Sequence, residues 1–238
     1  MTPLSRRRFC ATTLMSLSGF TLASAMPSDG QVEPSLRLPP HPDGSARVAL
    51  TLDACPGGFD DRIVRVLVQE RIKATIFVTA AWIHRNPAGL AEFLAHRDLF
   101  RLENHGARHI PAVLGHGTVY GLKVAGTLDA VRQEVSGGAT AIETAAGTRP
   151  GWYRDATARY SPEAIEMIEA MGLRIAGYSL NADQGASLPA ASVAQRIGRA
   201  RNGDVILGHV NQPLRSSGPG IAEGAVALHR QGMDFVWL

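Results

Sequence analysis

Runs of apolar residues alternate with amphipathic stretches along most of the chain. Strand-like runs occur at 47–53, 74–79, 99–104, 151–154, 173–180, 204–210 and 234–238. Segments with the apolar spacing of helices lie between them, at about 60–71, 88–96, 127–146, 162–171, 190–201 and 220–231. Strands that alternate with helices are typical of βα units and of a mainly parallel sheet. The pattern predicts the α/β class, with a barrel or a doubly wound sheet.

The first 25 residues have a different pattern. A basic front at residues 6–8 precedes an apolar middle, and residues 23–25 (ASA) fit a small-residue cleavage site. The apolar stretch is too short and too rich in hydroxyls for a membrane span, so 1–25 is predicted to be an export signal. Residues 5–9 (SRRRF) are similar to a twin-arginine signal, with general secretion as the alternative. We expect a periplasmic or extracellular protein, with no stable membrane insertion after cleavage.

The rest of the chain is predicted to form one domain. Residues 26–45 are rich in Pro, Ser and Gly and are predicted to be a linker into a catalytic domain at 46–238. The export signal carries three of the 24 basic residues and none of the 21 acidic ones, so the remaining chain is balanced in charge. The basic pI is therefore no sign of nucleic-acid binding, which needs a basic patch on the folded domain.

Polar side chains lie at the predicted carboxyl ends of five strands. They are Asp53, Asn104 with His105, Arg154 with Asp155, Asn181 with Asp183, and His209. In a parallel barrel these ends meet at one face, and active sites are built there. One such residue could be a turn former or a helix cap, but several at one face predict a functional site.

His105 and His109 have the spacing of a metal-binding pair. On one helical turn, residues four apart lie on the same face and could share Zn²⁺ or a similar ion. Chance pairs at this spacing are common among eight histidines, so the spacing alone is a weak signal. Gly106 follows His105, so the sequence lacks the glutamate of the HExxH proteases.

Three other residues could each have one of two roles. His209 ends an apolar strand and is either a buried, neutral histidine or an acid–base group. Arg154 is either a surface arginine or the partner that keeps a carboxylate ionised. Cys55, the one cysteine left after loss of the export signal, can form no internal disulfide. It is either a buried, inert thiol or a nucleophile, which would need a histidine or another cation nearby.

The order of these motifs resembles that of the polysaccharide deacetylases, the NodB-like carbohydrate esterase family 4. Residues 48–79 resemble the first motif and the βα unit after it, with TLDAC at 51–55 aligned with the usual T-F-D-D-G. Residues 102–109 (LENHGARH) resemble the second motif, H-[ST]-x-x-H. The arginine motif, the fourth motif and the C-terminal histidine motif are similar to WYRDATARY at 152–160, GYSLNADQGAS at 177–187 and VILGHVN at 205–211. The resemblance covers about residues 45–238.

The resemblance implies a distorted (β/α)7-type barrel, the NodB homology domain. It implies hydrolysis of N-acetyl or O-acetyl groups on a polysaccharide or oligosaccharide with a divalent metal, Zn²⁺ or alternatively Co²⁺. His105 and His109 would bind the metal, and Asp53 would be the general base. Arg154 would hold Asp53 ionised, and His209 would protonate the leaving group. Asp183, in the fourth motif, is a further catalytic candidate.

The chain departs from the family pattern at three positions. Ala54 stands where the family has a second aspartate as metal ligand, which leaves two assigned protein ligands where Zn²⁺ sites have three or more. The candidates for the missing ligand are Asp53, Asp60, Asp61 and Asp183, with helix capping as the other reading of Asp60 and Asp61.

Gly106 replaces the usual Ser or Thr, which removes a hydroxyl that could brace the loop. The arginine motif could also be read from Arg149, but Arg154 ends a predicted strand and is preferred.

An exported, metal-dependent polysaccharide deacetylase is the leading hypothesis. One alternative is a metal-free, non-catalytic glycan-binding barrel, which Ala54 favours. Another is an amidase for a non-carbohydrate C–N bond, because a fold does not fix its substrate. Four aromatic residues could stack on sugar rings or belong to the core: Trp82, Trp152, Tyr153 and Tyr160.

Overall fold

The computed structural model describes residues 23–25 and 30–238, and most of the predicted export signal lies outside the described residues. One curled sheet forms the centre, and all its strand pairs are parallel. Its strand order is β10-β11-β3-β4-β5-β8-β9, with β12 also paired to β3. The strands are β3 (Arg47–Ala54), β4 (Ala74–Val78), β5 (Phe100–Asn104), β8 (Trp152–Tyr153), β9 (Arg174–Ile175), β10 (Leu180–Asn181), β11 (Val205–His209) and β12 (Asp234–Phe235).

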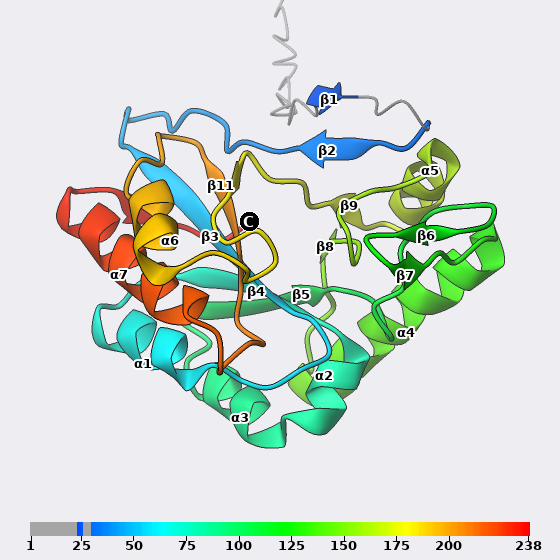
Figure 1. Ribbon diagram of the computed structural model, residues 1–238, viewed down its shortest axis with the longest axis horizontal. Coiled ribbons are helices and arrows are strands. Elements are labelled where there is room, and N and C mark those ends of the chain that lie inside the picture. The colour runs from blue at the N-terminus through cyan, green and yellow to red at the C-terminus, as the bar shows by residue number, and fades with distance from the viewer. Residues whose placement is uncertain (1–22, 26–29) are drawn as a thin grey trace, which may run out of the picture.

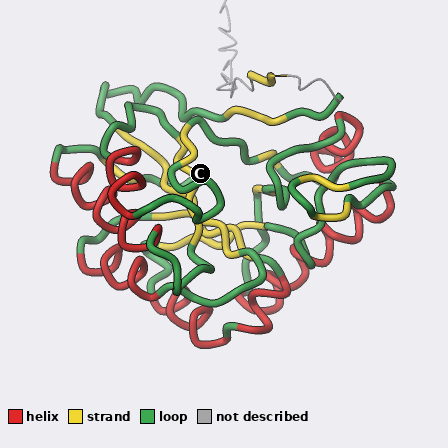
Figure 2. The backbone as a smooth tube through the Cα atoms, viewed as in Figure 1, coloured by secondary structure: helices red, strands yellow, loops and turns green. Residues whose placement is uncertain are grey.

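Helices surround the outer side of this sheet (Figures 1 and 2). They are α1 (Asp61–Gln69), α2 (Ala80–Arg85), α3 (Pro87–Ala95), α4 (Leu128–Ala146), α5 (Pro162–Ala170), α6 (Ala190–Ile197) and α7 (Ser217–Arg230). None of the described helices is both long enough and apolar enough to cross a bilayer.

The predicted α/β class and the parallel, curled sheet are confirmed. The predicted strand at 173–180 is two short strands, β9 and β10. The short helix α2 was not predicted; it starts directly after β4, where the Thr79 hydroxyl caps it by accepting from the Trp82 N–H at 3.0 Å. The small hairpin of β6 (Thr118–Val119) and β7 (Leu122–Lys123) was also not predicted.

Strand β3 is central and buried on both faces, as its apolar sequence requires. Leu50, Leu52 and Ala54 belong to the core between the sheet and the helices. Thr51 and Asp53 alternate with them and face the inside of the curl, where both side chains are buried. The largely apolar strand β3 thus places one carboxylate, that of Asp53, on the inner face of the sheet.

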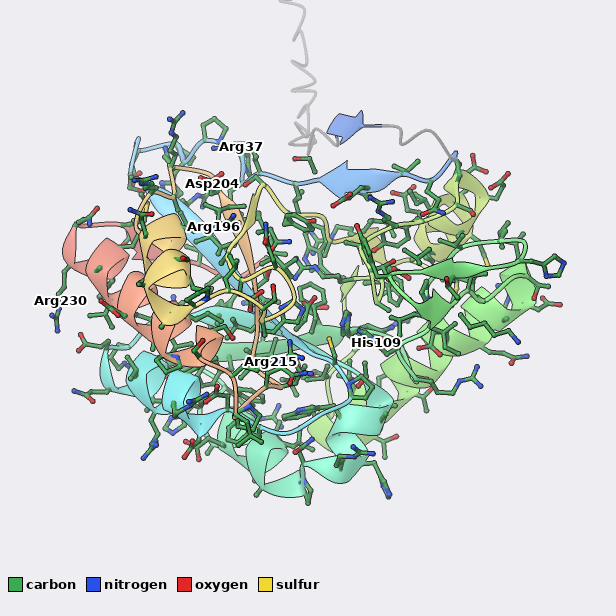
Figure 3. All side chains as sticks on the ribbon, in the orientation of Figure 1. Arg37, His109, Arg196, Asp204, Arg215 and Arg230 are labelled. Carbon is green, nitrogen blue, oxygen red and sulfur yellow. The ribbon has the colours of Figure 1, made fainter. Side chains whose placement is uncertain are left out.

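Part of the predicted linker packs on the sheet. Strand β2 (Glu33–Ser35) pairs with β1 (Ala23–Ala25) and crosses one side of the curl (Figure 1). Leu36 is 1% exposed and packs among inner-face residues such as Phe77. Arg37 forms an ion pair of 2.6 Å with Asp204, and both residues are labelled in the upper part of the molecule in Figure 3. An open linker would lack these contacts. Here apolar residues between the prolines, such as Leu36, pack against the barrel.

We predict that Leu36→Ala lowers the free energy of unfolding by roughly 2–5 kcal/mol, because it removes a fully buried side chain. Leu214→Ala is the matched control, since Leu214 is 98% exposed and its truncation should be nearly neutral. Urea unfolding of both variants measures the difference. Equal stabilities would contradict the packed role of residues 31–38.

Candidate active site

A buried ion pair joins the ends of two strands. Asp53 is the last residue but one of β3, and Arg154 follows β8 directly. Arg154 Nη1 donates to Asp53 Oδ1 at 2.9 Å and to the Thr51 hydroxyl at 2.8 Å. Its other nitrogens donate to the carbonyls of Ala176 and Gly177, each at 3.1 Å, and its guanidinium lies over the Phe77 ring.

This pairing keeps the Asp53 carboxylate ionised. Burial raises the pKa of Asp53, but the positive charges of Arg154 and His105 outweigh burial and hold that pKa below its usual value. The structure therefore brings Arg154 to the carboxylate, as its sequence reading proposed. Arg149, the other reading of the arginine motif, is exposed and lies 3.8 Å from Glu143.

His105 and His109 meet in a loop and not on a helix, which corrects the geometry assumed from their spacing. Their ring centroids are 4.9 Å apart. The buried Glu134 of α4 holds the loop: its Oε1 accepts from the N–H groups of Arg108 and His109, both at 2.7 Å, and of Ile110 at 3.2 Å. These bonds fix His109 at φ +70°, a left-handed conformation that costs a non-glycine residue on the order of 1 kcal/mol.

The structure explains why residue 106 is a glycine. Its φ is +86°, and a Cβ there would lie 2.5 Å from Glu134 Oε1. A Ser or Thr in this conformation would collide with the carboxylate, so the loop is braced by Glu134 and needs no hydroxyl at 106. Glu134 was missed from the sequence, because a glutamate on an amphipathic helix is usually solvated.

Arg154, which pairs with Asp53, also fixes the orientation of the His105 ring. Its Nδ1 lies 2.9 Å from the Arg154 carbonyl, which can only accept a hydrogen bond. Nδ1 therefore carries hydrogen in both protonation states, and Nε2 is the nitrogen that offers a lone pair once the ring is neutral. Nε2 lies 3.4 Å from Cys55 Sγ and 3.8 Å from Asp53 Oδ2. Burial lowers the pKa of His105, but Asp53 and Cys55 raise it to about 9.

Cys55 lies on the same side of the chain as Asp53. Burial raises the pKa of its thiol, but His105, by charge and hydrogen bonding, brings that pKa well below the usual value. One ligand atom each of Cys55, His105 and His109 lies within 4.8 Å of the others. The thiol is thus neither isolated nor inert, and the sequence reading had not counted it among the ligands.

His209 ends β11 and forms a second pair, with Asp183. Its Nδ1 lies 2.9 Å from Asp183 Oδ1, and its backbone N–H donates to Oδ2 at 2.8 Å. Burial lowers the pKa of His209, but Asp183 and Cys55, each by hydrogen bonding and charge, raise that pKa well above its usual value. Both Asp183 oxygens are therefore engaged by His209, and Asp183 is not a free metal ligand.

The other candidate carboxylates have structural roles. Asp60 caps α1 and forms a two-pronged pair with Arg62, at 2.7 and 2.6 Å. Asp61 lies in the first turn of α1, exposed and paired with Arg65. Asp155, which follows Arg154, accepts from the backbone N–H groups of Ala112 and Thr157. The capping reading of Asp60 is thus the one that the contacts support.

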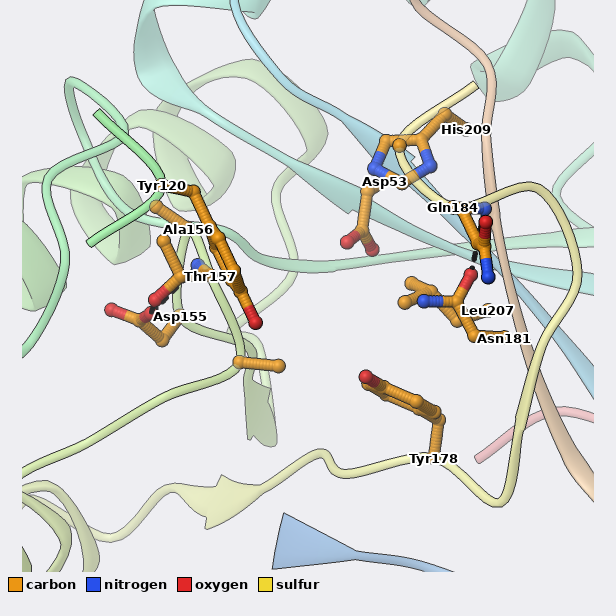
Figure 4. Close-up of a pocket in the computed structure, with 12 residues that line it drawn as sticks. Asp53, Tyr120, Asp155, Ala156, Thr157, Tyr178, Asn181, Gln184, Leu207 and His209 are labelled. Carbon is orange, nitrogen blue, oxygen red and sulfur yellow. Dashed lines mark hydrogen bonds between the residues drawn. The ribbon is translucent and has the colours of Figure 1, made fainter. Parts of the chain in front are cut away.

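A pocket of about 380 Å³ opens beside these pairs (Figure 4). Asp53 and His209 lie together on one wall, and Tyr120 and Tyr178 face the space from other sides. Asn181 and Gln184 line the remaining edge. The volume lies at the lower end of the range for small-molecule sites, about 300–1,000 Å³.

The four aromatic residues singled out from the sequence belong to the core. Trp82, Trp152, Tyr153 and Tyr160 are each at most 2% exposed. Tyr120 is 70% exposed at the turn of the β6–β7 hairpin, and its ring lies 5.1 Å from the Arg159 guanidinium. The aromatic faces open to a ligand are therefore on Tyr120, in the hairpin that was not predicted, and on Tyr178, which the predicted strand at 173–180 included but which lies between β9 and β10.

Comparison with known sequences identifies the family. The sequence model of the family described as polysaccharide deacetylase matches residues 41–176, more than half of the chain. The chain therefore belongs to the polysaccharide deacetylase family. No curated protein matches the sequence significantly. Asp183 and His209 lie beyond the matched residues, so their assignment depends on motif order and on the geometry above.

Solved structures share the fold at low identity. The Bc1960 peptidoglycan N-acetylglucosamine deacetylase has a TM-score of 0.71 and 20% identity, over 86% of this chain and 90% of its own. A family 4 carbohydrate esterase from Streptomyces lividans has a TM-score of 0.64 and 23% identity, over 80% of this chain and 91% of its own.

BA3943 from Bacillus anthracis, described as a family pseudoenzyme, has a TM-score of 0.65 and 20% identity, over 82% of this chain. This chain spans 64% of the length of that protein. The same fold therefore occurs in active enzymes and in a pseudoenzyme.

We predict that Glu134→Ala weakens Zn²⁺ binding at least tenfold, because three backbone N–H groups lose their acceptor and the His109 loop is released. Glu134→Gln keeps an oxygen acceptor and should retain most of the affinity. Glu143→Ala, an exposed change on the same helix, is the control. Competition with a chromophoric chelator measures the affinity. An alanine variant that binds zinc as wild type would show that Glu134 does not position the loop.

Proposed function

We propose that this protein is a metal-dependent deacetylase that hydrolyses acetyl groups on a polysaccharide or oligosaccharide. One observation carries the proposal: Asp53 and His209, whose pKa values are shifted in opposite directions, line the same pocket, next to three side chains that could hold a metal ion. Titratable groups with shifted pKa values cluster at catalytic sites, which favours an enzyme over a non-catalytic glycan-binding barrel.

The residues present fit a divalent cation. His109 Nε2 is buried and makes no hydrogen bond within the described part of the chain, as expected of an atom reserved for a ligand. It lies with a thiol and a second imidazole in one group, and these donors suit Zn²⁺ or Co²⁺. When bound, the cation would polarise the acetyl carbonyl and make water a stronger acid. His105 and His109 would hold it.

Asp53 is proposed as the general base. A base must be ionised before the reaction, and the low pKa of Asp53 ensures this. Arg154 occupies Oδ1, which leaves Oδ2 on the side of His105 to receive a proton from water. The buried guanidinium also fixes the direction of the carboxylate, so that little reorganisation is needed.

His209 is proposed as the general acid. The amine of an acetamide leaves only when it is protonated, so the site needs a group that carries a proton at neutral pH. Asp183 holds His209 in that state and fixes its ring through Nδ1, which leaves Nε2–H as the group that would protonate the amine. Asp183 acts through His209 and is a positioning residue.

The pocket supports a sugar as substrate. Sugar rings have apolar faces that pack on aromatic rings and hydroxyls that bind amides and phenols. Tyr120 and Tyr178 supply such rings, and Asn181 and Gln184 supply amide groups at the same pocket. This composition supports a glycan over the non-carbohydrate amide considered above.

Export is proposed from the N-terminal sequence alone. The basic residues 6–8, the apolar stretch after them and the small residues 23–25 support export through a cleaved signal. Cell fractionation, with N-terminal sequencing of the recovered protein, tests it. Uncleaved protein in the cytoplasm would contradict it.

We predict that protein stripped of metal releases no acetate from acetylated glycans, and that Zn²⁺ or Co²⁺ restores release. His105→Ala should abolish activity, whereas His116→Ala, at an exposed position, should leave it unchanged. An enzymatic acetate assay over chitin oligomers, peptidoglycan and acetylated exopolysaccharide measures this. Full activity of His105→Ala would contradict the metal assignment. Metal-independent glycan binding with no turnover on any polymer would favour the non-catalytic alternative.

We predict that Asp53→Asn lowers kcat by roughly 10²- to 10⁴-fold, because it removes the base. Asp61→Asn, at an exposed position on α1, is the matched control and should retain wild-type kcat. Far-ultraviolet circular dichroism shows whether Asp53→Asn, which leaves Arg154 without its partner, stays folded. A folded Asp53→Asn variant with kcat within threefold of wild type would exclude Asp53 as the base.

A further inference from the structure

We propose that Cys55 is the third protein ligand of the metal, as a thiolate, and that the site is a Cys-His-His centre. The inference rests on the proposed function, because it concerns the same cation. It answers the question raised by Ala54, which leaves the site without a second carboxylate.

Strand geometry explains why position 55 and not position 54 supplies the ligand. Ala54 is fully buried in the core between β3 and the helices, on the face it shares with Leu50 and Leu52. Cys55 follows on the opposite face, which it shares with Asp53, and its side chain reaches His105. A donor at 55 therefore enters the site without any change in the apolar layer.

The distance between Cys55 and His105 matches a tetrahedral ion. Bond lengths of about 2.3 Å to sulfur and 2.0–2.1 Å to nitrogen place S and N about 3.5 Å apart at a tetrahedral angle. Cys55 Sγ and His105 Nε2 are 3.4 Å apart. His109 completes a group of three donors within 4.8 Å of one another. Three protein ligands leave a fourth position open, as in catalytic zinc sites.

The contacts around the donors favour a ligand role over a nucleophile role for Cys55. In a Cys-His hydrolase, the histidine nitrogen remote from the thiol is oriented by a third group, and one histidine is sufficient. Here the remote Nδ1 of His105 is held by the Arg154 carbonyl, and Asp53 approaches Nε2, the nitrogen that faces the thiol. His209, whose Nδ1 is held by Asp183, also interacts with the Cys55 thiol. An oriented histidine is therefore present and does not by itself decide between the two roles. His109 also enters the cluster, and its buried Nε2 has no other described partner. A nucleophile does not need His109 with a buried, unpartnered Nε2, whereas a cation bound by both histidines and the thiol explains it.

A thiolate ligand affects which metal ion the site prefers. It carries the same single negative charge as the carboxylate it would replace, but it is a softer donor. Thiolate ligands select zinc over harder ions such as Mn²⁺ or Mg²⁺, for which carboxylate oxygens are better suited. We therefore expect the site to prefer Zn²⁺ and Co²⁺ over Mn²⁺ and Mg²⁺.

Cobalt spectroscopy tests the proposal without any activity measurement. Full-length protein carrying Cys10→Ala, with Cys55 as its one thiol, is stripped of metal and titrated with one equivalent of Co²⁺. We expect a thiolate-to-cobalt charge-transfer band in the near ultraviolet and the intense visible bands of a tetrahedral ion. In the same background, Cys55→Ser should lose the charge-transfer band and bind Co²⁺ at least tenfold more weakly. Cys55→Asp, which restores a charged donor, should bind cobalt without that band.

The outcomes separate this proposal from the proposed function. A band that depends on Cys55, in protein that releases no acetate, would support the ligand and reject the deacetylase. Cobalt binding with a spectrum and affinity unchanged in Cys55→Ser would reject the ligand and leave the deacetylase standing. Acetate release that survives chelation and is abolished by iodoacetamide would overturn the ligand role and make Cys55 a nucleophile.

Discussion

The buried ion pair of Arg154 and Asp53 holds the site together. Arg154 is fully desolvated, so its charge is stable there only with the Asp53 carboxylate and the carbonyls of Ala176 and Gly177 around it. Loss of one partner from a buried pair costs roughly 3–5 kcal/mol, because the other charge stays buried and unpaired. The Arg154 carbonyl also orients His105. One residue therefore sets the charge of the proposed base and the direction of a proposed ligand.

Two charged pairs, one with Asp53 and one with His209, border the pocket, and the pKa values of these two residues are shifted in opposite directions. On one side, Asp53 is kept ionised by an adjacent cation, and on the other, His209 is kept protonated by Asp183. Hydrolysis of an amide needs both a group that accepts a proton and one that supplies a proton. Environments that push the pKa values of two groups in opposite directions are the physical basis for assigning those roles. The polysaccharide deacetylase fold allows this because parallel strands end at one face.

The sequence predicts the fold and much of the site, because both follow from short-range patterns. Hydrophobic periodicity places the strands, and the strand ends place Asp53, Arg154 and His209 together. The His109 loop could not be predicted, because it depends on Glu134, 25 residues away on a helix. The sequence offers Cys55 as an inert thiol or a nucleophile, and the missing metal ligand was sought among the aspartates instead. Alternation along the strand puts residue 55 on the Asp53 face, and this signal could have found it.

The central claim is that Asp53 works beside a cation held by Cys55, His105 and His109. X-ray absorption at the zinc edge of the zinc-loaded protein tests it most directly, because the method counts the atoms bound to the metal. The account predicts one sulfur at about 2.3 Å and two imidazole nitrogens at about 2.0–2.1 Å per zinc. A shell of oxygen and nitrogen without sulfur, or without imidazole, would contradict it.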